Sequence, residues 1–178
     1  MIYNVSQLLK ELTGAVRRDE VDERLESSDE PWESCRVQGT VTLLRTHRGV
    51  LVTGELTTAI PLECGFCLES FDLPLVLSLE EEFFPIIDVS SGLPVGVPTE
   101  TGPFLIDKHH ILDISEAVRQ AIVLTTPISP RCGEDCRGLC PICGVNRNEQ
   151  QCSCEQPVDR RWTALGQLLG DIGTSNHP

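Results

Sequence analysis

The stretch Leu73-Pro74-Leu75-Val76-Leu77-Ser78-Leu79 carries leucine at every second position. Side chains of a β-strand alternate between its two faces, so this spacing predicts a strand with one buried face. Pro74 has no amide hydrogen to donate to a neighbouring strand, which predicts a position at a sheet edge or near the beginning of the strand. The leucine run therefore indicates a sheet with one apolar face.

The preceding residues extend the strand pattern over residues 35–84. Val37, Val41 and Leu43 alternate with polar residues, and Thr46-His47-Arg48-Gly49 is typical of a hairpin turn into Val50–Thr58. Hydrophobic residues make up 40% of the chain and aromatic residues only 4%, so we expect a core of Leu, Val and Ile. Together these features predict an antiparallel sheet or a small, partly open barrel.

Three helices are expected around these strands. Asn4–Leu12 is amphipathic, and residues 114–122 carry an apolar stripe at helical spacing behind a capping box of Asp113 and Glu116. A terminal helix is expected from residue 159 to about residue 169. The predicted fold class is therefore α+β, with helices flanking the sheet.

Two segments lack such periodicity. Residues 17–33 are rich in charged side chains and predict a solvated connector, whereas residues 85–106 contain four prolines and three glycines and predict a long loop. We expect residues 1–130 to form the α+β body. Residues 131–178 are expected to form a cysteine-rich zinc module that ends in the terminal helix.

Nine cysteines require a chemical explanation in this chain. Met1–Leu12 lacks the basic, apolar and small-residue zones of a signal peptide, and no apolar run is long enough to span a bilayer. We therefore expect a cytoplasmic protein without membrane contact. In a reducing compartment, clustered cysteines bind metal or perform redox chemistry more often than they form structural disulfides.

Most of the cysteines lie close together near the C-terminus. The centre of this cluster reads Gly138-Leu139-Cys140-Pro141-Ile142-Cys143-Gly144. Two residues between thiolates allow both sulfurs to face one ion, while Pro141 restricts the turn and Gly144 can adopt a positive φ. The cluster is completed by Cys132, Cys136, Cys152 and Cys154.

A second pair, Cys64 and Cys67, lies between strand-like segments and predicts a turn at a hairpin tip. With Cys35 interpreted as a buried strand residue, eight cysteines remain, enough for two four-thiolate sites. One division places Cys140, Cys143, Cys152 and Cys154 around one zinc ion and Cys64, Cys67, Cys132 and Cys136 around another. A single site with spare thiols is the alternative.

Zinc is expected rather than iron, and in a structural role. The cysteine spacing does not match a ferredoxin, and an all-thiolate site leaves no open position for catalysis. Residues 131–158 contain few large apolar side chains. Zinc binding to short peptides contributes roughly 10–16 kcal/mol at neutral pH, so the metal is expected to order this segment.

The alternative for Cys64 and Cys67 is a thiol–disulfide oxidoreductase or redox sensor. A thioredoxin-type motif requires a helix that begins at its first cysteine, and no helical pattern follows Cys67. The sequence also lacks a P-loop, a dinucleotide fingerprint and a nucleophile elbow. We therefore expect no enzymatic activity and no small-molecule substrate.

Charge is distributed unevenly along the chain. Residues 1–130 carry 9 Lys+Arg and 21 Asp+Glu, and residues 131–178 carry 5 and 6, within a total net charge of −13. The acidic part repels phosphates and favours basic protein partners. Candidate RNA contacts are the arginines of the near-neutral part, which are Arg131, Arg137, Arg147, Arg160 and Arg161.

Several short sequences, in a fixed order, carry a resemblance to a known family. They are residues 4–10 (NVSQLLK), 62–68 (LECGFCL), 79–83 (LEEEF), 113–119 (DISEAVR), 130–132 (PRC), 138–146 (GLCPICGVN), 152–154 (CSC) and 159–162 (DRRW). In these motifs the chain resembles the YceD-type large ribosomal RNA subunit accumulation proteins over nearly its whole length. Cys64 and Cys67 match the family broadly, whereas the C-terminal cluster matches its cysteine-rich branch.

The resemblance implies a non-catalytic role in the accumulation of large-subunit ribosomal RNA. Combined with the predicted zinc sites, it leads us to expect a zinc-binding assembly or stabilising factor. Its partners would be large-subunit ribosomal RNA, basic ribosomal proteins, or both.

Overall fold

The computed structural model describes residues 1–26, 32, 34–96, 104–154 and 161. The chain divides into two compact units. The first comprises Met1–Gly65 and Glu69–Cys132, and the second comprises Phe66–Leu68 and the residues from Gly133 onward. The expected division into domains 1–130 and 131–178 stays a prediction.

The first unit is built on a seven-stranded sheet with the order β1-β7-β6-β5-β4-β3-β2. Four long strands form an antiparallel series, whereas β5 and β6 run parallel. Parallel neighbours require a crossover connection, which residues 86–103 supply. The sheet is therefore mixed rather than purely antiparallel. Its strands are β1 (Ile2–Asn4), β2 (Val16–Glu26), β3 (Ser34–Arg45), β4 (Val50–Glu63), β5 (Ser70–Pro85), β6 (Phe104–Ile106) and β7 (Ile111–Asp113).

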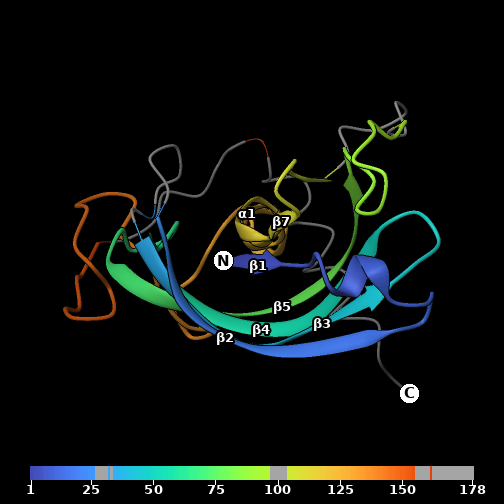
Figure 1. Ribbon diagram of the computed structural model, residues 1–178. Helices are drawn as coiled ribbons and strands as arrows, with labels where there is room; N and C mark the ends of the chain where they lie inside the picture. Colours follow the sequence, from blue (N-terminus) through green and yellow to red (C-terminus); the bar gives the residue numbers. More distant parts are fainter. Residues whose placement is uncertain (27–31, 33, 97–103, 155–160, 162–178) are drawn as a thin grey trace, which may run out of the picture. The chain divides into compact units, whose positions relative to one another are not determined.

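The long strands curl around one α-helix, α1 (Ser115–Thr125), and so form a half-barrel (Figure 1). Alternate residues of β3, β4 and β5 face this helix and are buried. The sequence predicts three helices around the sheet, but the described residues form only this one α-helix. The core includes Val37, Leu43, Val52, Leu56, Ile60, Leu77, Phe83, Val118 and Ile122.

The leucine run lies in β5, as its spacing predicts. Leu75, Leu77 and Leu79 are buried, and Pro74 pairs with Ala59 of β4. On the other side of β5, the short β6 pairs with Phe83–Pro85. Among the strands described, none therefore lies beside Pro74 on that side, which confirms the predicted edge position.

The expected helix at Asn4–Leu12 is wrong. Asn4 belongs to β1 and pairs with Ile111 of β7, and helical structure is limited to the 3₁₀ turn η1 (Leu8–Lys10). Short isolated helices are marginal in water, so tertiary contacts decide such a segment. Here strand pairing and the burial of Leu8 and Leu9 stabilise the alternative.

The expected connector at residues 17–33 is wrong for residues 17–26, which lie in β2 at one edge of the sheet, while residues 27–31 and 33 lie outside the described residues. Only Val21 and Leu25 are buried in this strand, so its apolar pattern is too sparse to predict a strand. Charged side chains at the remaining positions are common on edge strands because they discourage pairing with another chain.

The predicted helix at residues 114–122 and its apolar stripe are confirmed, but the capping box is wrong. The Asp113 carboxylate accepts hydrogen bonds from the Ser115 amide (2.9 Å) and hydroxyl (2.6 Å). Glu116 instead pairs with Arg119 at 2.7 Å and accepts a hydrogen bond from Gln120. Residues 104–106 of the predicted loop form β6. The terminal helix expected at 159–169 lies outside the described residues, except for Arg161.

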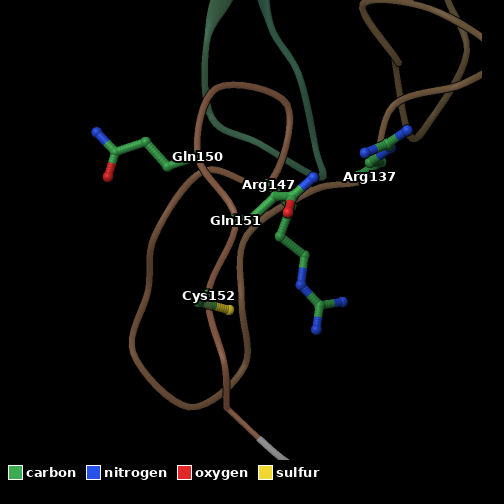
Figure 2. A pocket seen from close by; sticks show the side chains of 5 residues that line it. All are labelled: Arg137, Arg147, Gln150, Gln151 and Cys152. Carbon is green, nitrogen blue, oxygen red and sulfur yellow. The ribbon is translucent and has the colours of Figure 1, made fainter.

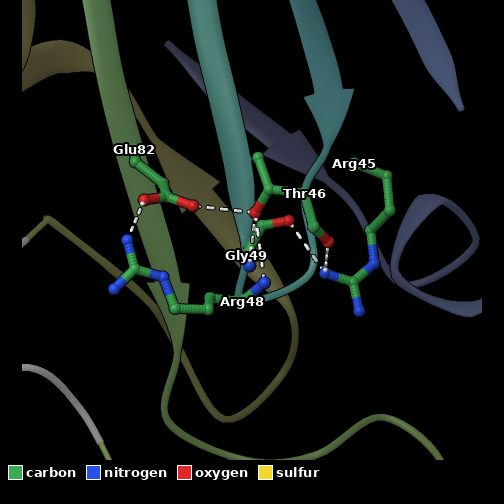
Figure 3. Close-up of polar contacts among 5 residues, drawn as sticks. All are labelled: Arg45, Thr46, Arg48, Gly49 and Glu82. Atoms are coloured by element: carbon green, nitrogen blue, oxygen red, sulfur yellow. Dashed lines mark hydrogen bonds and ion pairs between the residues drawn. The ribbon is translucent and has the colours of Figure 1, made fainter. Parts of the chain in front are cut away.

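The predicted hairpin turn connects β3 and β4 and is joined to β5 by side chains (Figure 3). The Thr46 hydroxyl donates to Glu82 Oε1 at 2.8 Å and accepts from the amides of Arg48 and Gly49. Arg48 forms an ion pair with the same carboxylate at 3.1 Å. Arg45 donates to the carbonyl oxygens of Thr46 and Gly49.

Candidate metal centre

A tight turn at Cys140–Gly144 forms the centre of the second unit. Leu139 and Asn146 form an antiparallel bridge on either side of it. Within the turn, the Cys140 amide donates to the Val145 carbonyl oxygen at 2.8 Å, and the Gly144 amide donates to the Cys140 carbonyl oxygen at 2.8 Å. These bonds place Cys140 and Cys143 on one small loop, as their spacing predicts.

Gly138 supports the same turn from the other side of the bridge. Its φ of +65° lies in the region that favours glycine, and a Cβ atom at this position would lie 3.0 Å from the Phe66 carbonyl oxygen. That oxygen accepts a hydrogen bond from the Leu139 amide at 2.9 Å. The close approach therefore depends on the absence of a side chain at residue 138.

Four cysteine sulfurs of this unit converge. The sulfur atoms of Cys140, Cys143, Cys152 and Cys154 all lie within 4.8 Å of one another. Cys140 is buried, Cys143 is exposed, and the other two are half-buried. All four ligand atoms are sulfur, which is the donor set of a closed structural zinc site.

The electrostatics of this group also fit a cation. Backbone hydrogen bonds from Cys143 and Ile142 lower the pKa of Cys140 to about 6, which favours the thiolate form of this sulfur. A hydrogen bond with Cys143, burial, and the negative charges of its sulfur neighbours raise the pKa of Cys154 to about 12. A thiolate cluster resists full ionisation in this way, and a divalent ion would remove the repulsion.

A second group has the same composition. The sulfur atoms of Cys64, Cys67, Cys132 and Cys136 also lie within 4.8 Å of one another. The structure thus brings the eight cysteines together in the same two sets of four that the sequence suggested. Each set can hold a metal ion, while the identity of the ion and its binding by these residues remain proposals.

The Cys64–Cys67 turn lies at the tip of the β4–β5 hairpin. The Cys64 amide donates to the Glu69 carbonyl oxygen at 2.9 Å, which closes the turn. Both cysteines are buried, and β5 rather than a helix follows them. Reactive thiols are usually accessible and near a helix N-terminus, so this setting does not favour the redox alternative.

Cys35 takes the structural role expected of it. It lies on β3 with 4% of its surface exposed, among the core residues. Burial raises the pKa of its thiol, which keeps it protonated and unreactive.

Two of the five candidate arginines line a cavity in the second unit. Arg137 and Arg147 line a volume of about 510 Å³ together with Gln150, Gln151 and Cys152 (Figure 2). The two glutamines were missed because an amide pair next to a cysteine has no recognisable spacing. The structure does not bring the remaining arginines to this cavity: Arg131 belongs to the first unit, Arg161 does not line the cavity, and Arg160 lies outside the described residues.

No helix in the described residues has both the length and the apolarity needed to cross a bilayer.

The curled sheet and the two four-cysteine groups define the protein as a β-rich chain that can bind metal through thiolates. Residues 52–169, more than half of the chain, match the family described as "Large ribosomal RNA subunit accumulation protein YceD". The chain belongs to this YceD family, which confirms the resemblance seen in its sequence.

Individual relatives agree with this assignment. A Mycobacterium bovis protein and a Mycobacterium tuberculosis protein are each 31% identical over 123 residues, which is 68% of this chain and 56% of the relative. An Arabidopsis thaliana protein named "Large ribosomal RNA subunit accumulation protein YCED homolog 1, chloroplastic" is 29% identical over 156 residues, 74% of this chain and 48% of that protein. The chain thus spans about half the length of the curated relatives it matches. No solved structure gives a significant match.

Proposed function

We propose that this protein is a non-catalytic, zinc-binding factor that supports the accumulation and assembly of large-subunit ribosomal RNA. It acts through contacts with that RNA, with basic ribosomal proteins, or with both. The observation that carries the proposal is the presence of two converging four-cysteine groups in a chain of the YceD family.

The metal part of the proposal depends on the donor set. Eight thiols in two groups of four provide two tetrahedral, all-sulfur sites, and zinc is the ion that most often occupies such sites. No His or carboxylate joins either group among the described residues. Both sites would therefore be closed and structural, which fits a non-catalytic protein.

The ribosomal part depends on family membership and on charge. The family description and the Arabidopsis relative both name large ribosomal RNA subunit accumulation. The net charge of −13 favours basic partners such as ribosomal proteins, and the arginines that line a cavity with Cys152 favour RNA. A cytoplasmic location stays a prediction, since the Arabidopsis relative is named chloroplastic.

Elemental analysis of the purified full chain tests the metal part. We expect one zinc ion per four-cysteine group. Replacing Cys143 and Cys154 with serine should remove one ion, replacing Cys67 and Cys136 should remove the other, and Cys35→Ser should remove neither. Iron, no metal, or the loss of both ions in one double variant would contradict the two-site assignment.

Alkylation of the thiols distinguishes the redox alternative. Metal-bound Cys64 and Cys67 should resist alkylation until a chelator is added. A metal-free protein that forms a reversible disulfide between these two residues would instead support the oxidoreductase or sensor.

The ribosomal part is tested in cells that lack the gene. We expect a lower ratio of large-subunit to small-subunit ribosomal RNA, restored by the wild-type gene. An unchanged ratio after deletion would overturn the proposed function.

A further inference from the structure

Two arginines that line the cavity of the second unit have no carboxylate partner among the described residues. Arg137 is exposed and Arg147 is half-buried, and both line the cavity. Within the described ranges of the chain, neither guanidinium forms an ion pair with a carboxylate. By contrast, most of the described arginines that form an ion pair with a carboxylate lie on the sheet or on α1. Arg36, which pairs with Asp22, is an example. Within that part of the chain, the two cavity arginines are therefore available to an anion.

The backbone holds the two arginines on facing segments. The Arg137 amide donates to the Asn148 side-chain oxygen at 2.8 Å, and the Arg147 amide donates to the Gly138 carbonyl oxygen at 2.9 Å. The Leu139–Asn146 bridge adjoins both bonds. Because these three contacts join the segments in one register, the two side chains emerge from a preorganised frame. Such a frame lowers the entropic cost of binding a ligand.

The chemistry of the lining matches a phosphate ester. Guanidinium groups donate paired hydrogen bonds to phosphate oxygens, and the amides of Gln150 and Gln151 can both donate and accept. The cavity volume of about 510 Å³ falls in the range of ligand clefts, roughly 300–1,000 Å³. The described lining includes two cations and two neutral amides but no carboxylate, which favours an anionic ligand that also carries polar groups.

We infer that this cavity binds the backbone phosphate of single-stranded RNA, with Arg137 and Arg147 as the phosphate contacts. The inference rests on the proposed function and deepens it, because it assigns direct RNA contact to one named site. Single-stranded segments can bend and present an isolated phosphate beside an unstacked base, which double-stranded RNA does not do. Gln151 lines the same cavity, where a base edge or a ribose hydroxyl can reach its amide.

A competing explanation gives the arginines a role toward the metal. Four thiolates around one divalent ion leave a net negative charge, and Cys152 of that group lines the same cavity. Guanidinium groups beside it would then stabilise the bound metal. The two explanations differ in what is lost when both arginines are replaced: RNA affinity in one case, and zinc retention in the other.

The test compares two double variants of the full, zinc-loaded chain. Arg137→Ala with Arg147→Ala removes the cavity charges. Arg18→Ala with Arg24→Ala removes the same charge from exposed positions on β2. Binding to a fluorescently labelled single-stranded RNA of about 12 nucleotides is measured by anisotropy at several salt concentrations, and zinc is quantified in the same samples.

We expect the cavity variant to bind roughly tenfold more weakly for each arginine removed, because each loses a charge-assisted hydrogen bond. The slope of log affinity against log salt should fall by roughly 1.4, the value for two lost phosphate contacts on a single strand. The β2 variant should bind like the wild type, and zinc content should stay the same in both.

The inference would be overturned if the two double variants bound RNA equally well. It would also be overturned if neither the variants nor the wild type bound RNA. Loss of zinc without a specific loss of RNA affinity would overturn it as well. Expression of both variants in cells lacking the gene separates the inference from the proposed function. If the deletion lowers large-subunit RNA and the cavity variant restores it fully, the function stands and the site is wrong; if the deletion has no effect, the function itself fails.

Discussion

Gly138 and Gly144 share a backbone conformation but differ in their surroundings. Their φ angles are +65° and +74°, respectively, which residues with a side chain rarely adopt. A Cβ at Gly138 would lie 3.0 Å from the Phe66 carbonyl oxygen, whereas a Cβ at Gly144 would meet nothing within 4 Å. A substitution at Gly144 therefore tests backbone strain alone, whereas a substitution at Gly138 tests strain together with a steric clash.

We expect Gly144→Ala to destabilise the turn by about 1 kcal/mol through strain alone, and Gly138→Ala to cost more because its clash involves backbone. Zinc release to a chromophoric chelator measures the effect. Gly133→Ala is the control, since a Cβ at residue 133 would meet nothing within 4 Å and its φ lies outside the left-handed region. Equal zinc release by the residue 138 and residue 144 variants would show that the close approach to Phe66 has no energetic role.

At the level of the elements, the β3–β4 turn depends on Thr46. Its hydroxyl takes part in three hydrogen bonds: it donates one to Glu82 of β5 and accepts two from the Arg48 and Gly49 amides of the turn (Figure 3). We expect Thr46→Val to lower the free energy of unfolding by about 1–2 kcal/mol, because the amides and the carboxylate lose a partner. Urea denaturation followed by circular dichroism measures this change.

Thr57→Val is the matched control. The Thr57 hydroxyl lies on the exposed face of β4 and makes one long hydrogen bond of 3.3 Å to the Gln38 carbonyl oxygen. Its loss should change the free energy of unfolding by less than about 0.5 kcal/mol. Equal losses in the two variants would mean that the Thr46 network does not stabilise the turn.

The helix α1 carries a pH-dependent interaction. Hydrogen bonds from Arg119 and Gln120 lower the pKa of Glu116 from 4.5 to about 2. Because the pKa is lower in the folded chain, the ionised carboxylate stabilises the fold above pH 4.5, and this contribution disappears as the pH falls toward 2. The side chain is exposed, so the contribution should be about 0.3–0.5 kcal/mol.

Glu116→Gln should therefore destabilise the protein slightly at neutral pH and make no difference near pH 2. Thermal unfolding across this pH range measures the difference from the wild type. Glu55→Gln is the control, because the Glu55 carboxylate has no ion-pair partner in the described part of the chain. A difference that persists unchanged at low pH would contradict the assignment to the carboxylate charge.

For the whole molecule, the two units differ in what stabilises them. The large apolar core lies entirely in the first unit. Among the described residues of the second unit, Cys67 and Cys140 are the buried hydrophobic ones. So little apolar burial does not offset the loss of conformational entropy, so the proposed metal would supply the free energy that orders this unit.

Removal of zinc should therefore affect the two units unequally. We expect a chelator to accelerate hydrogen exchange at the amides of Leu139, Cys140 and Arg147, while the amides of β3 and β4 stay protected. Mass spectrometry of exchanged peptides measures both regions in one sample. Slow exchange at residues 139–147 after complete zinc removal would show that backbone hydrogen bonds alone order the turn.

Part of this architecture could be predicted because its signals are local. The period-two leucines of β5, the apolar stripe of α1 and the Cys-Pro-x-Cys-Gly turn each lie within a few consecutive residues. Side-chain alternation, helical spacing and two-residue cysteine spacing are properties of the backbone itself. They therefore determined the central strands, the helix and the clustering of cysteines without any knowledge of distant contacts.

The remaining features depend on residues far apart in the chain. Asn4 joins β1 rather than a helix because Ile111 lies opposite it, and the charged β2 is a strand because β3 offers it a full set of partners. The parallel β5–β6 pair and the cavity of Arg137 and Arg147 likewise require segments to meet in space. Only the tertiary structure decides such features, because hydrogen bonding and burial between distant segments outweigh the weak preferences of short sequences.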